Sequence, residues 1–268
     1  MSTANSEVQM KPPFAYYGGK QQLAKRILAL IPPHIQYTEA FTGGGAIFFA
    51  KPPSEVEVLN DTNKELINFY KVVQNDFVYL QREISISLHS RLLHKHARAV
   101  YENPELFSDI KRAWALFILA TQSFGAMLDA TWGYDVKKNQ TPKKCKNKIM
   151  AFTEDYAIRL QDVQIECTDA LRIIKSRDTP DAFHYVDPPY YNSDCGHYDG
   201  YTERDYEELL TTLEKIEGKF LLSSYPSEVL KRFVKKNGWY QITVEMNLSM
   251  SRNGNKKTEV FTANYPIK

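Results

Sequence analysis

Cysteine is scarce in this sequence, which holds only Cys145, Cys167 and Cys195 among its 268 residues. Three cysteines cannot all pair within one chain, and their spacing matches no metal-binding pattern. A disulfide-stabilised secreted scaffold and a cysteine-based zinc site are therefore excluded, and no metal site is predicted. The expected location is a reducing one, the cytoplasm.

Long hydrophobic runs are missing as well. No apolar stretch approaches the roughly 20 residues that span a bilayer, and residues 1–10 lack the charged and apolar regions of a signal peptide. We therefore expect no membrane partner. An excess of charge is also absent, since 34 Lys and Arg oppose 32 Asp and Glu for a net charge of +2. Overall charge is thus weak support for nucleic-acid binding, and the local distribution of charge must decide.

The composition that remains is that of a globular α/β protein with an insertion. Hydrophobic residues make up 43% and charged residues 25% of a chain long enough for one sizeable core. Strand and helix patterns alternate near both ends, whereas residues 76–124 show mainly helical periodicity without strands. We predict one α/β domain built from residues 1–75 and 153–268, and an inserted subdomain at residues 76–152.

The most informative stretch is a short aromatic and β-branched run, residues 182–186, which predicts a buried strand. It ends at Asp187-Pro188-Pro189-Tyr190, and ligands of open α/β sheets bind just beyond such strand ends. The prolines restrict the backbone, so two acceptors (the Asp187 carboxylate and the Pro188 carbonyl) and the Tyr190 ring form a rigid unit. A strand followed by a proline turn with a solvated Asp187 is the alternative.

This unit suits a planar group that bears an NH2, such as the exocyclic amine of a nucleobase. An aromatic amine is a poor nucleophile because its lone pair is delocalised into the ring. Two acceptors that hold its N–H groups favour a more tetrahedral nitrogen, and they matter most as positive charge develops. Tyr190 could stack on a base taken out of a duplex.

Two glycine turns stand near the start of the chain. The first, Gly18-Gly19, ends the aromatic segment from residue 12 and places Lys20 where it could meet a carboxylate; a turn that caps a helix is the alternative. The second follows a strand at residues 35–41 and reads Thr42-Gly43-Gly44-Gly45 before an apolar helix. Such a turn lets backbone N–H groups face a ligand. Its spacing is neither that of a dinucleotide fold nor that of a P-loop.

Acidic residues follow two further predicted strands. Asp61 comes after residues 56–59, at the place where nucleoside-binding folds hold a ribose hydroxyl. Asp169 comes after residues 163–167 and could accept a ligand's amine. A helix N-cap is the alternative for each, and the two roles are compatible.

A basic segment lies within the insertion. Residues 123–150 lose periodicity and carry Trp132, Tyr134 and six lysines, and no acid lies between Asp135 and Glu154. We expect a loop or hairpin that tracks phosphates and touches bases, rather than a merely solvated face. The lysines are Lys137, Lys138, Lys143, Lys144, Lys146 and Lys148. A polar, basic link at residues 249–257, with Arg252, could also touch a phosphate.

Taken together, these motifs resemble the DNA adenine methylases whose target-recognition region lies in mid-chain. The resemblance covers residues 12–75 and 155–268 and rests on motifs in the family's order on strand ends. Its N-terminal cofactor motif matches residues 13–20, and its glycine motif matches residues 37–46, with Ala40 where proline is common. Its acidic strand end matches Asp61, its catalytic motif residues 187–190, and its usual ending residues 257–265.

The resemblance implies a seven-stranded, Rossmann-like methyltransferase sheet, mostly parallel with one reversed strand, that binds S-adenosylmethionine. It implies transfer of methyl to the exocyclic amine of a flipped adenine in double-stranded DNA, with a restriction endonuclease as a possible partner. The implied catalytic residues are Asp187, Pro188, Pro189 and Tyr190. The implied cofactor residues are Tyr16, Lys20, Glu39, Phe41, Gly43, Gly44, Asp61, Asp169 and Asp187. The expected DNA contacts are Trp132, Tyr134, Lys137, Lys138, Lys143, Lys144, Lys146 and Arg252. The mid-chain region lacks the Asn-Gly-rich hairpin of methylases that act at GATC, so no recognition sequence is predicted.

Other functions compete with this interpretation. A methyltransferase for RNA or for a protein glutamine can use a related motif with Asn in place of Asp, and Asp187 together with the basic insertion favours DNA. A cytosine-carbon methylase needs a cysteine nucleophile, usually after proline, and no cysteine of this chain follows a proline. A catalytically inactive DNA-binding module and a plain nucleotide-binding protein would be distinguished by binding of S-adenosylmethionine.

Overall fold

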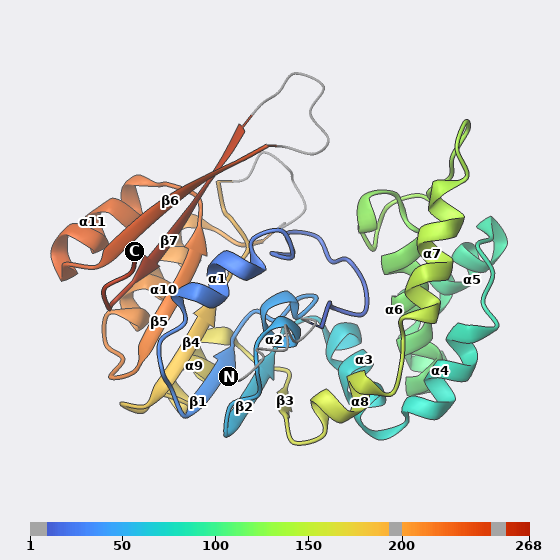
Figure 1. Ribbon diagram of the computed structural model, residues 1–268, viewed down its shortest axis with the longest axis horizontal. Helices are drawn as coiled ribbons and strands as arrows, with labels where there is room; N and C mark the ends of the chain where they lie inside the picture. The colour runs from blue at the N-terminus through green and yellow to red at the C-terminus, as the bar shows by residue number, and fades with distance from the viewer. Residues whose placement is uncertain (1–9, 193–199, 248–255) are drawn as a thin grey trace, which may run out of the picture. The chain divides into compact units, whose positions relative to one another are not determined.

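The computed structural model describes residues 10–192, 200–247 and 256–268, and Figure 1 shows the arrangement of their helices and strands. The first part of the chain forms α1 (Ala24–Leu30), β1 (Gln36–Glu39), α2 (Ala46–Ala50), β2 (Val56–Asn60) and α3 (Lys64–Asn75). The middle part is helical, with α4 (Phe77–Ser85), α5 (Arg91–Glu102), η1 (Pro104–Leu106), α6 (Asp109–Gln122), η2 (Phe124–Ala126), α7 (Gln140–Met150) and α8 (Asp155–Leu160). The last part forms β3 (Gln164–Glu166), α9 (Ala170–Ser176), β4 (Ala182–Val186), α10 (Glu203–Leu213), β5 (Lys219–Ser224), α11 (Glu228–Asn237), β6 (Tyr240–Asn247) and β7 (Lys256–Ala263).

The strands form one seven-stranded sheet in the order β3-β2-β1-β4-β5-β7-β6. β1 pairs in parallel with both β2 and β4, and β4 pairs in parallel with β5. β7 lies between β5 and β6 and runs antiparallel to both. The predicted fold, a mostly parallel sheet with one reversed strand in an α/β protein, is confirmed.

The central strand β4 is buried along its whole length, which explains why residues 182–186 read as a continuous apolar run rather than an alternating one. Its neighbours are β1 and β5 (Figure 1). Side chains of α9, α10 and α11 pack with those of the sheet into one core. That core holds Ile174, Val186, Leu209, Phe220 and Trp239, among others. Strand β4 is thus held rigidly up to the residue before Asp187.

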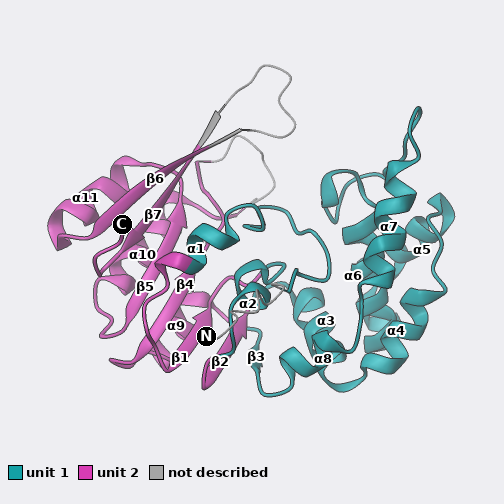
Figure 2. Cartoon of the chain, in the orientation of Figure 1, with its two compact units in different colours: residues 1–28, 43–53, 61–167 teal, residues 29–42, 54–60, 168–268 magenta. Residues whose placement is uncertain are grey.

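The chain divides into two compact units, shown in different colours in Figure 2. Unit 1 comprises residues 1–28, 43–53 and 61–167, and unit 2 comprises residues 29–42, 54–60 and 168–268. The predicted boundaries of an inserted subdomain, near residues 75 and 152, stay a prediction.

The core of unit 1 is built around α6, whose residues Ala113–Ala120 are all buried. A helix that is apolar on every side is expected to be enclosed by others. Four phenylalanines from separate segments meet there: Phe14 lies 4.9 Å from Phe69, and Phe152 lies 5.4 Å from Phe117 between ring centroids. Gln74, near the end of α3, donates hydrogen bonds to the carbonyls of Leu160 (2.7 Å) and Val163 (2.9 Å). This side chain ties α3 to the end of α8.

The expectation of a loop or hairpin over residues 123–150 is wrong for its second half. Residues 140–150 form the helix α7, so Lys143, Lys144 and Lys146 lie on a helix. Within this helix Cys145 is buried, whereas Lys143, Lys144 and Lys146 are exposed. The helix therefore lacks the apolar stripe by which a sequence pattern predicts an amphipathic helix. In the parts of the chain that the structure describes, no helix is long and apolar enough to cross a membrane.

Candidate active site

The carboxyl ends of β1, β2 and β4 lie at one edge of unit 2, since the three strands are parallel neighbours. Glu39, the last residue of β1, is in register with Leu59 on one side and with Tyr185 on the other. Asp61 comes two residues after Leu59, and Asp187 comes two residues after Tyr185. The two carboxylates therefore occupy equivalent positions relative to the register of the strands. The sequence-based placement of both carboxylates at strand ends is correct.

Tyr190 is anchored by its hydroxyl. The hydroxyl donates to Asp187 Oδ1 at 3.0 Å, contacts Ser223 Oγ at 3.1 Å, and forms a short hydrogen bond with Glu259 Oε1. The edge of the ring meets Tyr225, with centroids 4.5 Å apart. Burial, then the negative charges of Asp187 and Glu259, raise the pKa of Tyr190 well above its ordinary value. The phenol therefore stays protonated and acts as a hydrogen-bond donor.

Glu259 and Ser223 were not expected in the site. Glu259 lies on β7 with 1% of its surface exposed, and it accepts a hydrogen bond from Ser223 Oγ at 2.6 Å. A charged residue is almost never fully buried without partners. A glutamate directly before the apolar pair Val260 and Phe261 was the available signal. The resemblance at residues 257–265 implies no role for this side chain.

The remaining predicted residues of unit 2 are held by local contacts. Glu39 is 2% exposed and accepts a hydrogen bond from the Tyr37 hydroxyl at 2.6 Å. The ring of Phe41 meets Tyr201 edge-on at 6.5 Å. Asp169 is exposed and caps α9, because its Oδ1 accepts the N–H of Arg172 at 3.0 Å. The helix-cap alternative for Asp169 is therefore correct, and a ligand contact there stays a prediction.

Asn60 joins the segments behind this edge. Its side-chain amide donates to the carbonyls of Ala40 and Thr168 at 3.0 Å each, and its Oδ1 accepts the Thr168 N–H at 3.0 Å. Its backbone N–H donates to Thr42 Oγ1 at 3.0 Å. This fully buried side chain fixes the loops after β1 and β3 to the end of β2.

In unit 1, Asp61 binds the glycine turn. Its Oδ2 accepts the N–H of Gly43 at 2.9 Å, and its Oδ1 accepts the N–H of Asn63 at 2.9 Å. The N-cap of α3 is Asn63, not Asp61, because the Asn63 side chain accepts from the second and third N–H groups of the helix. Burial raises the pKa of Asp61, and the backbone N–H groups of Asn63, Gly43 and Thr62 oppose that rise. Backbone groups thus fix the orientation of the carboxylate.

Tyr16 explains why the glycine turn needs glycine. A side chain built at Gly44 would place its Cβ 2.8 Å from Tyr16 Cβ, and one at Gly43 would lie 3.2 Å from the Tyr16 ring. Gly43 also has a φ of 49°, a conformation that other residues rarely adopt. The group that packs closely against the backbone of Gly43 and Gly44 is therefore the Tyr16 side chain. Lys20 is buried and donates to the carbonyl of Gly18 at 3.1 Å.

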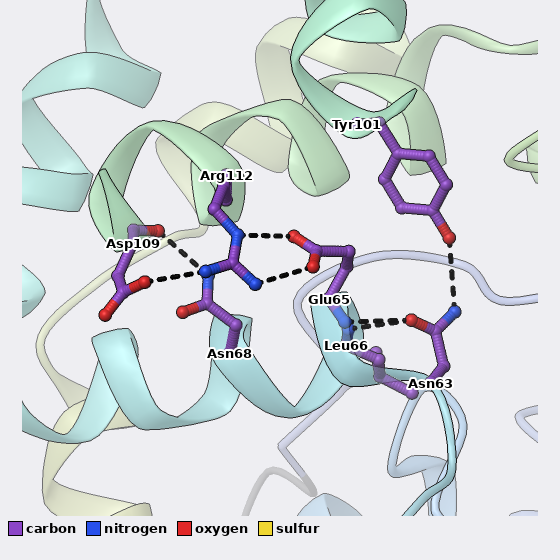
Figure 3. A network of polar contacts seen from close by, with 7 residues as sticks. All are labelled: Asn63, Glu65, Leu66, Asn68, Tyr101, Asp109 and Arg112. Atoms are coloured by element: carbon purple, nitrogen blue, oxygen red, sulfur yellow. Dashed lines mark hydrogen bonds and ion pairs between the residues drawn. The ribbon is translucent and has the colours of Figure 1, made fainter. Parts of the chain in front are cut away.

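A polar network links the N-terminus of α3 to the helices of the insertion (Figure 3). The side-chain amide of Asn63 donates to the Tyr101 hydroxyl at 3.3 Å and to the Tyr16 hydroxyl at 3.4 Å. Beside it, Arg112 of α6 holds the carboxylate of Glu65 with two hydrogen bonds, of 2.6 and 3.0 Å. Bidentate pairs of this kind fix geometry as well as charge. Hydrogen bonds thus connect Tyr16, a predicted cofactor residue of unit 1, through Asn63 to α5, and the neighbouring Glu65 to α6.

An aromatic and cationic cluster forms within the insertion. Trp132 stacks on His89, with ring centroids 4.7 Å apart, and on Tyr134, with centroids 5.7 Å apart. The guanidinium of Arg91 lies 4.8 Å from the Trp132 ring and 5.5 Å from the Tyr134 ring. Tyr134 is 60% exposed. The structure therefore brings together Trp132 and Tyr134, the two predicted aromatic contacts. Arg91 and His89 also belong to the cluster, and no local sequence pattern indicated them.

The lysines of the insertion divide into two groups. Lys137 and Lys138 in the turn before α7, and Lys143, Lys144 and Lys146 on α7, are exposed. Lys148 instead donates to the carbonyl of Pro12 at 3.2 Å, and burial followed by repulsion from Lys11 lowers its pKa. It does not belong to the exposed basic surface. Arg252 lies outside the described residues.

The seven-stranded, mostly parallel sheet, with Asp61 and Asp187 directly after two of its parallel strands, agrees with the class that the sequence predicts, a methyltransferase that acts on an amino group. Comparison with protein families agrees: residues 16–248 match the family described as D12 class N6 adenine-specific DNA methyltransferase. The chain belongs to this family.

Three curated proteins are similar to the chain. Type II methyltransferase M1.LlaDCHI of Lactococcus lactis subsp. cremoris is 24% identical, over 97% of each chain. Type II methyltransferase M.MjaIII of Methanocaldococcus jannaschii is 24% identical, over 75% of this chain and 76% of that protein. The DNA N-6-adenine-methyltransferase of Escherichia phage P1 is 26% identical over 66% of this chain, which corresponds to 24% of that protein.

Proposed function

We propose that this adenine-specific DNA methyltransferase uses S-adenosylmethionine to methylate the exocyclic nitrogen of an adenine taken out of double-stranded DNA, with Asp187 as the group that orients the amine. The observation that carries the proposal is the Asp187–Tyr190 pair, held at the end of the buried strand β4. A carboxylate there can accept an N–H, and an aromatic ring beside it can meet the face of a base.

The residues of unit 1 fit the proposed cofactor. A carboxylate offers about four acceptor sites, and the backbone N–H groups of Gly43, Asn63 and Thr62 act on Asp61. The remaining capacity suits a hydroxyl of a ribose. Lys20 would meet the carboxylate of the methionine part, and Tyr16, Gly43 and Gly44 are the other proposed cofactor residues of unit 1. In unit 2 the proposed cofactor residues are Glu39, Phe41 and Asp169. When bound, S-adenosylmethionine supplies a methyl group carried on a sulfonium, which is electrophilic enough for a weak amine nucleophile.

Asp187 acts as acceptor and orienter rather than as a strong base. An ordinary aspartate, with a pKa of about 3.9, cannot deprotonate a neutral aromatic amine. By accepting an N–H it favours a tetrahedral nitrogen, and that hydrogen bond strengthens as the nitrogen becomes cationic. The carbonyl of Pro188 is the second acceptor. The proton leaves the nitrogen after methylation.

A covalent enzyme intermediate is not part of the proposal. A cysteine would be its nucleophile, and Cys145 is unsuited: its Sγ donates to the carbonyl of Thr121, and burial raises the pKa of the thiol to about 11. The thiolate is the reactive form of cysteine. Cys167 is exposed, and Cys195 lies outside the described residues.

The proposed DNA surface is the exposed part of the insertion. The five exposed lysines would meet phosphates, and Trp132 and Tyr134 would reach bases. Arg252 is proposed as a further phosphate contact. The names of the relatives, type II methyltransferases, support a place in a restriction-modification system with an endonuclease partner. A cytoplasmic location is proposed from the scarcity of cysteine in the sequence.

The test is transfer of label from S-adenosylmethionine to a mixed-sequence duplex, followed by separation of the bases. Label on adenine is expected. Label on cytosine, or on RNA but not on DNA, would contradict the proposal. Expression in cells that lack adenine methylation, with sequencing of modified adenines, would then give the recognition site.

A further inference from the structure

Arg91, at the start of α5, lies against two aromatic rings. Its guanidinium carbon is 4.8 Å from the centre of the Trp132 ring and 5.5 Å from the centre of the Tyr134 ring. A cation and an aromatic face attract each other within roughly 6 Å. The two rings are nearly parallel, with an angle of 15° between their planes. Aromatic contacts therefore hold the guanidinium of a side chain that is otherwise exposed.

The N–H donors of Arg91 are not used within the part of the chain that the structure describes. Its guanidinium makes no hydrogen bond or ion pair with residues 10–192, 200–247 or 256–268. Nearby arginines differ in this respect: Arg112 grips the carboxylate of Glu65, and Arg98 donates to the carbonyl of Ala130 at 2.9 Å. Arg91 thus combines a fixed plane with donors that can bind a ligand.

Gln122, the last residue of α6, fixes the two segments that carry the cluster. Its side-chain amide donates to the carbonyl of Leu88 at 2.9 Å, and its Oε1 accepts the N–H of Ser90 at 3.3 Å. Its backbone carbonyl accepts the N–H of Gly133 at 2.8 Å. His89 adds a link, because its Nε2 donates to the carbonyl of Gly133 at 3.0 Å. The backbone before Arg91 and the backbone between the two rings are therefore anchored to one buried residue.

We infer that Arg91 reads a guanine of the recognition sequence, by donating two parallel hydrogen bonds to O6 and N7 at the major-groove edge of that base. The inference rests on the proposed function of the insertion as the DNA surface. Arginine on guanine is the commonest specific contact between proteins and DNA, because the planar fork matches the two acceptors. A guanidinium that is already held in one plane loses less freedom when it binds than a mobile side chain does.

A phosphate contact is the other use of an exposed arginine. A phosphate accepts point charges, and the exposed lysines of the insertion supply them. Nothing in that role requires two aromatic rings to set the plane of the cation. The two roles also have different effects. A guanine contact acts at one position of the sequence, whereas a phosphate contact acts on all duplexes and on their salt dependence.

The first experiment selects and sequences the members of a randomised duplex library that bind wild type, Arg91→Ala, Arg91→Lys and Lys95→Ala. Lys95 is the matched control, since it is an exposed cation one turn further along α5. We expect Arg91→Ala to lose a preference for guanine of about 5- to 150-fold at one position, with a nearly unchanged salt slope. Arg91→Lys keeps the charge without the fork and should recover only part of the preference. Lys95→Ala should keep it.

The second experiment replaces that guanine by 7-deazaguanine, which lacks the N7 acceptor and keeps the base pair. Binding by wild type should weaken, and binding by Arg91→Ala should not change further. Equal weakening of both proteins, an unchanged site preference in Arg91→Ala, or a loss confined to the salt slope would overturn the inference. Both experiments measure binding. A wild type that shows this arginine-dependent guanine preference but methylates no adenine would therefore contradict the proposed reaction alone.

Discussion

Asp61 and Gly43 are joined by a hydrogen bond of 2.9 Å from the glycine N–H to the carboxylate. The acidic residue after β2 and the glycine turn after β1 are therefore one element. The same carboxylate binds the N–H of Asn63, so its two oxygens point in directions that the backbone dictates. A change at Asp61 is expected to disturb the turn as well as any hydroxyl that the carboxylate binds.

Asp61→Ala should weaken binding of S-adenosylmethionine by about 10- to 100-fold, the loss of one or two hydrogen bonds to a charged group. Non-specific DNA affinity should stay nearly unchanged. Calorimetric titration measures the first, and fluorescence anisotropy the second. Glu228→Ala is the control, since Glu228 is an exposed carboxylate of α11 whose one ion pair among the described residues is with Lys231. Unchanged cofactor affinity in Asp61→Ala would limit Asp61 to its backbone contacts.

Asp187→Asn should lower the rate of methyl transfer by about 100-fold or more. The amide can accept only through one atom, and its NH2 opposes the donor amine. Binding of cofactor and duplex should persist, because no backbone contact of the strand is lost. Single-turnover rates at saturating DNA test this, and a rate within threefold of wild type would remove Asp187 from its proposed role.

Replacement of Lys143, Lys144 and Lys146 by Ala should weaken binding to all duplexes alike. Each lost phosphate contact should remove about 0.9 from the slope of log affinity against log salt concentration. The matched control is the triple alanine variant at Lys231, Lys235 and Lys236, three exposed lysines of α11. Equal slopes for the α7 variant and wild type would show that this basic face is only solvated.

Tyr134→Ala should change site choice rather than salt dependence. Tyr134 is mostly exposed and stacks on Trp132. Its removal would take away a proposed base contact and leave every lysine in place. We expect relaxed discrimination at one or two positions, worth about 1–3 kcal/mol each. Methylation of a randomised duplex library measures this; an unchanged site preference would contradict it.

His184→Leu should make the protein less sensitive to acid. His184 is fully buried in β4, and neither ring nitrogen has a hydrogen-bond partner among the described residues. Burial lowers its pKa to about 4, against the smaller opposing effect of Asp178. Between pH 6.5 and 4 the unfolded chain therefore binds more protons, so the stability from this residue is full above pH 6.5 and is lost as the pH falls.

The effect for His184 is on the order of 2–3 kcal/mol at full development. Unfolding of wild type and His184→Leu in urea at pH 7 and pH 5 measures it. His94, whose pKa burial also lowers to about 4, acts in the same direction, so part of the dependence should remain in the variant. An identical pH dependence in both proteins would contradict the prediction.

Local patterns predicted most of the fold because the strands and caps have strong local causes. The run at residues 182–186 is apolar throughout because β4 is buried on both faces, and Asp187 follows it directly. Helix α1 ends before Pro32, as proline requires. The reversed strand β7 came from resemblance to a family, since alternation along a strand does not show the direction in which it pairs.

The contacts between distant residues could not be predicted in this way. Glu259 and Tyr190 lie 69 positions apart, and nothing near either residue names its partner. The same holds for Asn63 and Tyr101, and for Arg91 beside Trp132. Helix α7 was missed because its lysines and asparagine give a weak helical pattern, while packing of Cys145 supplies the missing stabilisation.

The hydrogen bonds of Gln74 bear on how such enzymes can acquire new recognition sites. Because Gln74 ties the end of α3 to the end of α8, the chain that leaves after α3 returns to the same place. The cost of closing a loop rises only slowly with its length. Helix α3 also packs on α6 of the intervening segment, where Arg112 holds Glu65, so a segment of different length or sequence must supply an equivalent contact. If the insertion reads the target, as we propose, a chimaera joined just after Asn75 and just before Asp155 is expected to transfer target choice when the incoming segment keeps that contact.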